Sequence, residues 1–546
     1  MGVPALVMLV IGLWGLDRGG IWRDEAVTFQ VGRRTVPQIW RLLHGVDAVH
    51  GLYYLLMHAV LAVHPGEVVL RLPSVAAAAV TAGLVAALGT RLVRPRVGLW
   101  AGLLYAVTPM AGHYAQEGRS YALVAAGATG ATVLLVRAVR HTRQARGPRD
   151  AREVRGARGG SWCAYGVVLA LTCWLHEFAV LLLLAHAVSL LLARAGTRVW
   201  RQWGRVSGAV VLSLLPMIVL SRAQAAQVAW LRRPTADTAD GVSRAFLGSV
   251  PGVYWVCLGF ALVALAGLVG RRGELTCAGV ALPLTVVPPG VLMLVSQVSP
   301  LYVDRYVLYA LSGAPLLVAC GAERVAGALR RLRPGGAGTP GPLRSGGDGA
   351  PAFLWSVPGG PSRPPRLGGR FRLVTWAGVL GVVLVLHQQF ALLRADRDPG
   401  RRPDDLAAVS RIAARRLAPG DPMLFLPAQT RNVAIAYPRA FRGARDVALV
   451  EGAAASGTLY GREAGPGELR RRLARLDRVW VVADPRLLAG RWTPSQPAER
   501  IKLAVLEGEF TRREEAARGG LTVRLYVRRL SAPTVLRTPP PRPARW

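Results

Sequence analysis

The chain has 546 residues, of which 52% are hydrophobic and 18% are charged, and its mean hydropathy is +0.32. In soluble proteins about a quarter of the residues are charged, so this composition excludes a wholly soluble enzyme, a disordered scaffold and a secreted disulfide-rich module. The net charge of +37 comes almost entirely from arginine, with Lys502 the only lysine. Many arginines stand in short loops between apolar segments, where the positive-inside rule explains them better than nucleic-acid binding.

Eleven apolar segments predict a polytopic α-helical membrane protein, since a spanning helix needs about 20 apolar residues. They are 3–17, 71–91, 97–113, 120–138, 161–175, 178–194, 205–221, 250–270, 274–297, 305–328 and 372–393. The apolar run 52–63 is shorter and suits an interfacial helix. If this run does not cross, the arginine-rich connections all fall on one side, which the positive-inside rule assigns to the cytoplasm. Those connections are 91–96, 139–160, 194–205, 271–272 and 329–372.

The composition changes after residue 330. Residues 331–371 are rich in Gly, Pro, Arg and Ser and predict a disordered cytoplasmic linker between the transmembrane domain 1–330 and the last span, 372–393. Strand-like runs then alternate with helical stretches and predict a small extracytoplasmic α/β domain over 394–530. The runs are 423–427, 446–450, 479–483 and 521–527, and the Pro-rich tail 531–546 is expected to be disordered.

The five cysteines predict neither a disulfide framework nor a metal site, because they stand in apolar segments without a CxxC or CxxH pair. They are Cys163, Cys173, Cys257, Cys277 and Cys320.

Two polar motifs lie in the predicted first extracytoplasmic loop, 18–70. Asp24 and Glu25 are adjacent carboxylates directly after the first span. One of them could act as a general base toward an acceptor hydroxyl, or both could serve only as an acidic helix N-terminus. The second motif leads into the interfacial segment with His50, Tyr53 and Tyr54. These tyrosines could contact substrate or serve as membrane anchors.

Two further motifs stand at the outer ends of later spans. Gln116, Glu117 and Arg119 lie in a hairpin between two spans, where the arginine could bind phosphate or pair with the glutamate. His176 and Glu177 separate two very apolar spans. Ionisable residues at this depth either serve a function or reach back to the boundary by snorkelling.

The fifth motif, with Tyr302, Asp304 and Arg305, again combines a carboxylate and an arginine at an outer helix end, where a simple anchor pair is the alternative. The predicted topology places all five motifs on one face, whereas random polar interruptions would scatter over both. The sequence therefore predicts one site beside a lipid-accessible cavity. There is no HExxH, P-loop or strand-linked GxGxxG motif, so we expect no nucleotide and no required metal, although a divalent ion remains an alternative.

The runs RDEA, HGLYYLLMHAVLAV, LRLPS, YAQEGRSYAL, HEF and SPLYVDRYVL, in this order, resemble the GT-C superfamily of membrane glycosyltransferases. The chain looks most like bacterial family 39 proteins, often called mannosyltransferases, which are relatives of protein O-mannosyltransferases and aminoarabinose transferases. The resemblance covers about residues 1–330. Asp24 matches the key aspartate of the family, and Glu25 follows it as in the family's DE pair. Gly51 departs from the HxPLYY pattern of many relatives and loosens the loop where the acceptor would fit.

The resemblance implies an inverting transfer of a sugar from a polyprenyl-phosphate donor to an acceptor outside the plasma membrane. Asp24 would accept the proton of the acceptor hydroxyl, Glu25 would orient the acceptor or Asp24, and Arg119 and Arg305 would bind the donor phosphate. The substrate site would be shaped by His50, Tyr53, Tyr54, Gln116, Glu117, His176, Glu177, Tyr302 and Asp304.

Two other classes of function stay open at this point. A transporter or flippase for a lipid-linked sugar would place binding groups near the bilayer midplane. A catalytically silent sensor or scaffold would tolerate neutral residues at Asp24 and Glu25. The sequence does not identify the sugar, and the acceptor could be a protein, a lipid or a polysaccharide.

Overall fold

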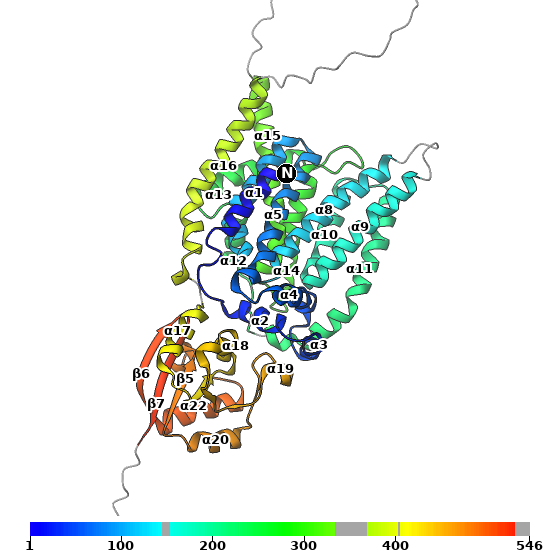
Figure 1. Ribbon diagram of the computed structural model, residues 1–546. Coiled ribbons are helices and arrows are strands. Elements are labelled where there is room, and N and C mark those ends of the chain that lie inside the picture. The colour runs from blue at the N-terminus through cyan, green and yellow to red at the C-terminus, as the bar shows by residue number, and fades with distance from the viewer. Residues whose placement is uncertain (145–152, 229, 333–368, 402–403, 530–546) are drawn as a thin grey trace, which may run out of the picture.

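The computed structural model describes residues 1–144, 153–228, 230–332, 369–401 and 404–529. A helical bundle carries a small α/β domain at one end (Figure 1). Within the described ranges, six helices are long and apolar enough to span a membrane. They are α5 (Glu67–Leu92), α8 (Tyr121–Gln144), α11 (Thr197–Ala223), α14 (Cys277–Val295), the continuous pair η5 (Asp304–Gly313) and α15 (Ala314–Leu332), and α16 (Gly369–Asp396).

The other five predicted spans also coincide with helices, but these helices are shorter or broken. They are α1 (Gly2–Leu13), α6 (Pro95–Val107) with α7 (Pro109–Ala115), α9 (Glu153–Leu175), η2 (Glu177–Leu181) with α10 (Leu182–Leu192), and α13 (Pro251–Ala264). Pro109 ends α6, because the residue before a proline avoids helical geometry. The extended backbone of His176 separates α9 from η2. Before α13, Gly248 at φ +143° allows an 83° bend after α12 (Ala236–Leu247).

The first loop folds into short helices at the end of the bundle that carries the α/β domain (Figure 1). These helices are α2 (Arg23–Gly32), α3 (Val36–Gly45), η1 (Ala48–His50) and α4 (Gly51–Val63). The helix expected over 52–63 is therefore present, and its 13 residues are too few to cross a bilayer. The ends of α15 and α16 that flank residues 333–368 lie at the opposite end of the bundle. The predicted linker between 333 and 368 and the tail 531–546 lie outside the described residues.

The α/β domain contains a five-stranded mixed sheet in the order β2-β1-β5-β7-β6. β1 is parallel to β2 and β5, and β7 is antiparallel to β5 and β6. The strands are β1 (Pro422–Leu426), β2 (Arg445–Asp446), β5 (Arg478–Ala483), β6 (Phe510–Arg518) and β7 (Leu521–Arg528). A separate two-stranded sheet joins β3 (Leu449–Glu451) to β4 (Arg462–Glu463). The helices of this domain include α17 (Leu406–Arg416), α18 (Asn432–Ala436), α20 (Pro466–Ala474) and α22 (Pro497–Glu509).

The strand predictions need two corrections. The run 446–450 is not one strand, because it is divided between β2 and β3 in different sheets. The sequence also failed to predict β6, whose FTRREEAAR is highly charged. β6 is an edge strand paired only with β7, and charged residues are typical of such edges.

The cysteine prediction is wrong for one pair, since Cys277 on α14 and Cys320 on α15 form a disulfide. Their helices pack side by side, and a separation of 43 residues in the sequence gives no sign of that contact.

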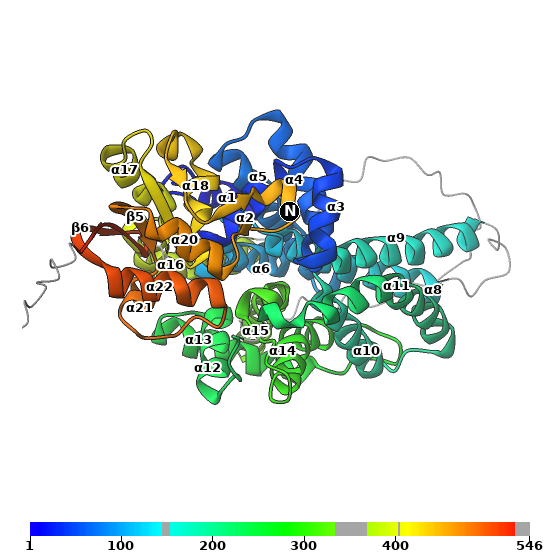
Figure 2. The same ribbon diagram turned by 90° about the horizontal axis from the view of Figure 1, so that it is seen from below.

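The α/β domain packs against the first loop through a shared hydrophobic core. Ile21 and Phe29 of the loop belong to the same buried cluster as Val409, Phe425 and Trp480 of the domain. Polar contacts surround this core: Arg23–Asp404 at 3.3 Å, Gln30–Asn432 at 3.3 Å and Tyr437–Glu67 at 2.6 Å. Seen from below, the domain covers the side of α1 and α2 and leaves α9, α10 and α11 uncovered (Figure 2). α2 therefore packs between α4 of the first loop and α18 of the α/β domain.

Candidate active site

The N-terminus of α2 presents Asp24 at the end of the bundle. Trp22 is the N-cap, and its backbone N–H donates to Glu25 Oε2 at 3.4 Å in a capping box. The exposed backbone N–H groups and the dipole of this helix end favour a negative charge there. The Asp24 side chain keeps 27% of its surface exposed, whereas most residues of α2 after it are buried. Asp24 is thus the accessible carboxylate of the pair.

Glu25, by contrast, belongs to a fully buried ion pair with Arg71 of α5. Arg71 donates from Nε and Nη2 to the two carboxylate oxygens at 2.8 and 2.7 Å, and both side chains have 0% exposure. Glu25 Oε1 also accepts from the Gly118 backbone N–H at 2.9 Å. Arg71 in turn donates to the carbonyls of Leu16 and Gly20. Glu25 thus joins α2, α5 and the hairpin, and its buried carboxylate does not face an acceptor; of its two predicted roles, orienting Asp24 stays a prediction.

Arg305 lies opposite Asp24. Its Nη2 is 3.3 Å from Asp24 Oδ2, and 22% of its side chain is exposed. Its guanidinium carbon stands about 6 Å from the ring centres of Trp22, Tyr121 and Tyr306, within cation–π range. Arg305 Nε is buried and has no hydrogen-bond partner among the described residues. Arg305 therefore places its positive charge beside Asp24, and its Nε–H can still donate a hydrogen bond.

Arg119 is buried deeper in the same cluster. It donates to Thr28 Oγ1 at 3.3 Å and from Nη2 to His50 Nε2 at 2.8 Å. Its other Nη1 contact, to the Asp24 carbonyl, is 3.5 Å long. Arg119 therefore holds the first turn of α2 against the hairpin and adds positive charge behind Asp24 and Arg305.

His50 and His176 face each other, with ring centres 5.9 Å apart. Burial, followed by the charge of Arg119, lowers the pKa of His50 well below its ordinary value. Burial, followed by the charges of Arg119 and Arg305, lowers the pKa of His176 to about 3. Both imidazoles are therefore neutral at physiological pH, whereas Asp24 beside them is a partly exposed carboxylate.

Glu117 is a buried carboxyl in the hairpin, with 6% exposure. Burial raises its pKa from 4.5 to about 7, while the charges of His113 and Arg305 oppose the shift. Because the folded protein holds this proton more tightly than the unfolded chain, ionisation of Glu117 opposes folding as pH rises from 4.5 to 7. Above about pH 7 the full free-energy cost of ionising the buried Glu117 lowers the stability of the folded protein.

Replacing Glu117 by Gln removes this titration. We expect the stability of the Glu117→Gln protein to rise relative to wild type by about 3 kcal/mol between pH 4.5 and pH 7.5. Thermal unfolding of both proteins in the same detergent across this range measures the difference. Parallel stability curves would show that Glu117 does not carry a raised pKa.

The remaining predicted residues divide into two groups. Tyr54 donates to Asp47 Oδ2 at 2.7 Å beside His50, and Tyr302 is buried next to the exposed Asp304. Two others make structural contacts: Gln116 donates to the Gly12 and Trp14 carbonyls at 2.9 and 2.8 Å, and Glu177 accepts from Ser221 at 2.7 Å. Tyr53 is fully buried, and its phenol lies within electrostatic range of Arg119, Glu25 and Glu117.

Sequence reasoning missed several residues of the cluster. Tyr121 and Tyr306 line Arg305, Asp47 binds Tyr54, and Arg71 neutralises Glu25. An arginine at the start of an apolar span needs a buried partner, which was the available signal for Arg71. Among the residues described, no three His, Cys, Asp or Glu side chains are placed to share a metal ion.

No protein-family model and no curated protein sequence matches the chain, whereas solved structures do. ArnT from Cupriavidus metallidurans matches with a TM-score of 0.57 at 14% identity, covering 96% of this chain and 97% of ArnT. The same protein bound to undecaprenyl phosphate matches with a TM-score of 0.55. The oligosaccharyltransferase AglB from Archaeoglobus fulgidus, in complex with an inhibitory peptide and a dolichol-phosphate, matches with a TM-score of 0.50 at 10% identity, covering 96% of this chain and 74% of AglB. The predicted fold class is confirmed: this multi-pass membrane chain shares the fold of ArnT and AglB, a bundle of apolar helices, and carries a small C-terminal α/β domain.

Proposed function

We propose that the protein is an inverting membrane glycosyltransferase that uses a polyprenyl-phosphate sugar as its donor. The observation that carries this proposal is the partly exposed pair of Asp24 and Arg305, with Tyr121 and Tyr306 beside the arginine. The complexes of similarly folded proteins with undecaprenyl phosphate and a dolichol-phosphate support the donor class.

Arg305 is the first candidate for the donor phosphate. Among the described residues its Nε has no hydrogen-bond partner, and its partly exposed guanidinium can bind phosphate through paired N–H groups. Arg119 is already bonded to Thr28 and His50, so it would act mainly by adding charge behind the phosphate. The polyprenyl tail would lie along the apolar helices, with the phosphate at the bundle end that carries α2.

The transfer itself needs a base and a stabilised leaving group. The acceptor oxygen would attack the anomeric carbon from the face opposite the phosphate, and the bond from that carbon to the phosphate oxygen would break with its electron pair. Asp24 would accept the proton of the acceptor hydroxyl. Arg305 and Arg119 would stabilise the charge that develops on the departing polyprenyl phosphate. Glu25 and Arg71 would act indirectly by holding the α2 N-terminus in place.

We place this site on the extracytoplasmic face of the plasma membrane. The basic connection at 91–96 follows α5, whose other end carries Arg71, the partner of Glu25, and the positive-inside rule assigns such a connection to the cytoplasm. The α/β domain would then also lie outside the cell, because it shares the end of the bundle with α2 (Figure 1).

Replacing Arg305 by Ala tests the assigned phosphate contact. We expect the affinity for undecaprenyl phosphate to fall by about tenfold to a hundredfold, because a charge-assisted hydrogen bond is lost. Equilibrium binding of the labelled lipid to purified protein in detergent measures this change. Arg33→Ala, an exposed arginine at the end of α2, is the matched control and should leave the affinity unchanged. Undiminished binding by Arg305→Ala would contradict the phosphate assignment.

A further inference from the structure

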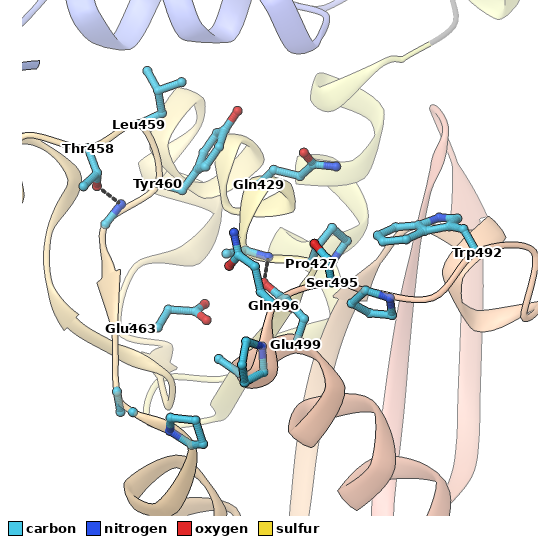
Figure 3. Close-up of a pocket in the computed structure, with 18 residues that line it drawn as sticks. Pro427, Gln429, Thr458, Leu459, Tyr460, Glu463, Trp492, Ser495, Gln496 and Glu499 are labelled. Atoms are coloured by element: carbon cyan, nitrogen blue, oxygen red, sulfur yellow. Dashed lines mark hydrogen bonds between the residues drawn. The ribbon is translucent and has the colours of Figure 1, made fainter. Parts of the chain in front are cut away.

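A large cavity lies in the α/β domain, outside the cluster around Asp24. It has a volume of about 700 Å³, which is within the range of small-molecule sites. Figure 3 shows it between the segment that carries Thr458, Leu459 and Tyr460 and the segment that leads from Trp492 to Glu499, with Pro427 and Gln429 between the two segments. None of the sequence motifs pointed to this cavity.

The lining of the cavity combines aromatic, amide and carboxylate groups. Trp492 is 36% exposed at one side, and Tyr460 lies at the edge (Figure 3). Gln429 and Gln496 supply amide donors and acceptors. The charged residues of the lining are Glu463 and Glu499; it includes no arginine or lysine, although the chain carries a net charge of +37. This lining disfavours phosphates and other anionic ligands.

Buried cations hold the two carboxylates in place. Lys502, with 0% exposure, lies 2.9 Å from Glu463 and 2.8 Å from Glu499. Arg431 contacts Glu463 at 2.7 Å and also donates to the Tyr460 carbonyl at 2.8 Å. Because the charges of the carboxylates are largely offset, a neutral ligand fits the cavity better than a cationic one. The amide donors and acceptors of Gln429 and Gln496, next to an aromatic face, suit a ring with several hydroxyl groups.

The wall of the cavity is joined directly to the helix that carries Asp24. Arg34, just after α2, donates to the Thr458 carbonyl at 2.8 Å. Burial, and after it the charges of Asp47 and Asp24, raise the pKa of Tyr460 to about 12, so this side chain lies within electrostatic range of both carboxylates. Tyr460 therefore stands between the cavity and the Asp24 cluster.

We propose that this cavity is an acceptor subsite that binds a neutral sugar residue, so that the acceptor is a glycan. The acceptor role in this inference rests on the proposed transferase function, whereas the binding of a sugar is argued from the cavity alone. A glycan held here would extend past Tyr460 toward Asp24, where its terminal hydroxyl would be activated.

The test measures binding without any donor. Full-length protein in detergent is titrated with mannotetraose, a linear arabinotetraose and galactotetraose, and separately with an arginine- and proline-rich peptide. We expect saturable binding of at least one oligosaccharide, weakened about tenfold or more in Trp492→Ala and in Gln496→Ala. Trp230→Ala, another exposed tryptophan outside the cavity, is the matched control and should bind like wild type.

Three outcomes would overturn the inference: binding of none of the oligosaccharides by wild type, binding that Trp492→Ala leaves unchanged, or peptide binding that depends on Trp492. In a transfer assay, Trp492→Ala should raise the KM for a glycan acceptor with kcat and the donor KM unchanged. If wild type transfers sugar and Asp24→Asn does not, but wild type binds no oligosaccharide, the acceptor subsite is overturned and the transferase function stands. Oligosaccharide binding without any transfer would instead leave the cavity assignment standing and count against the transferase function.

Discussion

Replacing Asp24 by Asn should lower sugar transfer by about 10²–10⁴-fold without unfolding the protein. Asn keeps the size of the side chain but cannot accept the proton of the acceptor hydroxyl. The ion pair with Arg305 is partly exposed on both sides, at 27% and 22%, so its loss should cost little stability. Initial rates of transfer from a labelled polyprenyl-phosphate sugar, together with the melting temperature, measure both effects.

Two controls make this result specific. Asp17→Asn removes an exposed carboxylate from the same loop and should leave the rate unchanged. Undecaprenyl phosphate should still bind to Asp24→Asn, because Arg305 and Arg119 remain. A folded Asp24→Asn protein with full activity would contradict the assignment of the base.

Replacing Glu25 by Gln should have a different effect, a loss of stability of about 3–5 kcal/mol. The substitution leaves the Arg71 guanidinium charged, fully buried and without its counter-ion. Activity should fall with the fraction of folded protein, because Glu25 acts by holding the α2 N-terminus. Denaturant or thermal unfolding in detergent, compared with wild type, measures the change.

An exposed ion pair supplies the matched control for this prediction. Asp240 and Arg244 pair at 2.6 Å with 52% and 38% exposure, so Asp240→Asn should cost less than about 1 kcal/mol. A double-mutant cycle with Arg71→Met should give a large coupling energy between Glu25 and Arg71. A Glu25→Gln protein that is as stable as wild type but inactive would contradict the positioning role and favour direct contact with the acceptor.

Asp24 and Glu25 are adjacent in the sequence, yet they have different environments in the structure. Charge distribution and segment length predicted the helical bundle, and the motifs around Asp24, His50, Arg119 and Arg305 do meet in space. The sequence could not separate Asp24 from Glu25, because the difference is the burial of one carboxylate against Arg71 of another helix.

Other features depended on tertiary packing in the same way. Gln116 looked like a substrate residue, but its amide caps carbonyls at the end of α1. The Cys277–Cys320 disulfide follows from the contact of two helices, and the cavity beside Trp492 forms only when two distant segments come together. Hydrophobic periodicity predicts elements along the chain, and it carries no information about such pairings.

The most direct test of the central claim is sugar transfer by the purified wild-type protein in lipid. Radiolabelled mannosyl and arabinosyl polyprenyl phosphates are each incubated with cell-envelope acceptor, without nucleotide. We expect label from at least one donor to move to the acceptor, with inverted anomeric configuration and one polyprenyl phosphate released per sugar transferred. Transfer with retained configuration would contradict the single-displacement mechanism. Tight binding of the donors without any transfer would contradict the proposed glycosyltransferase activity.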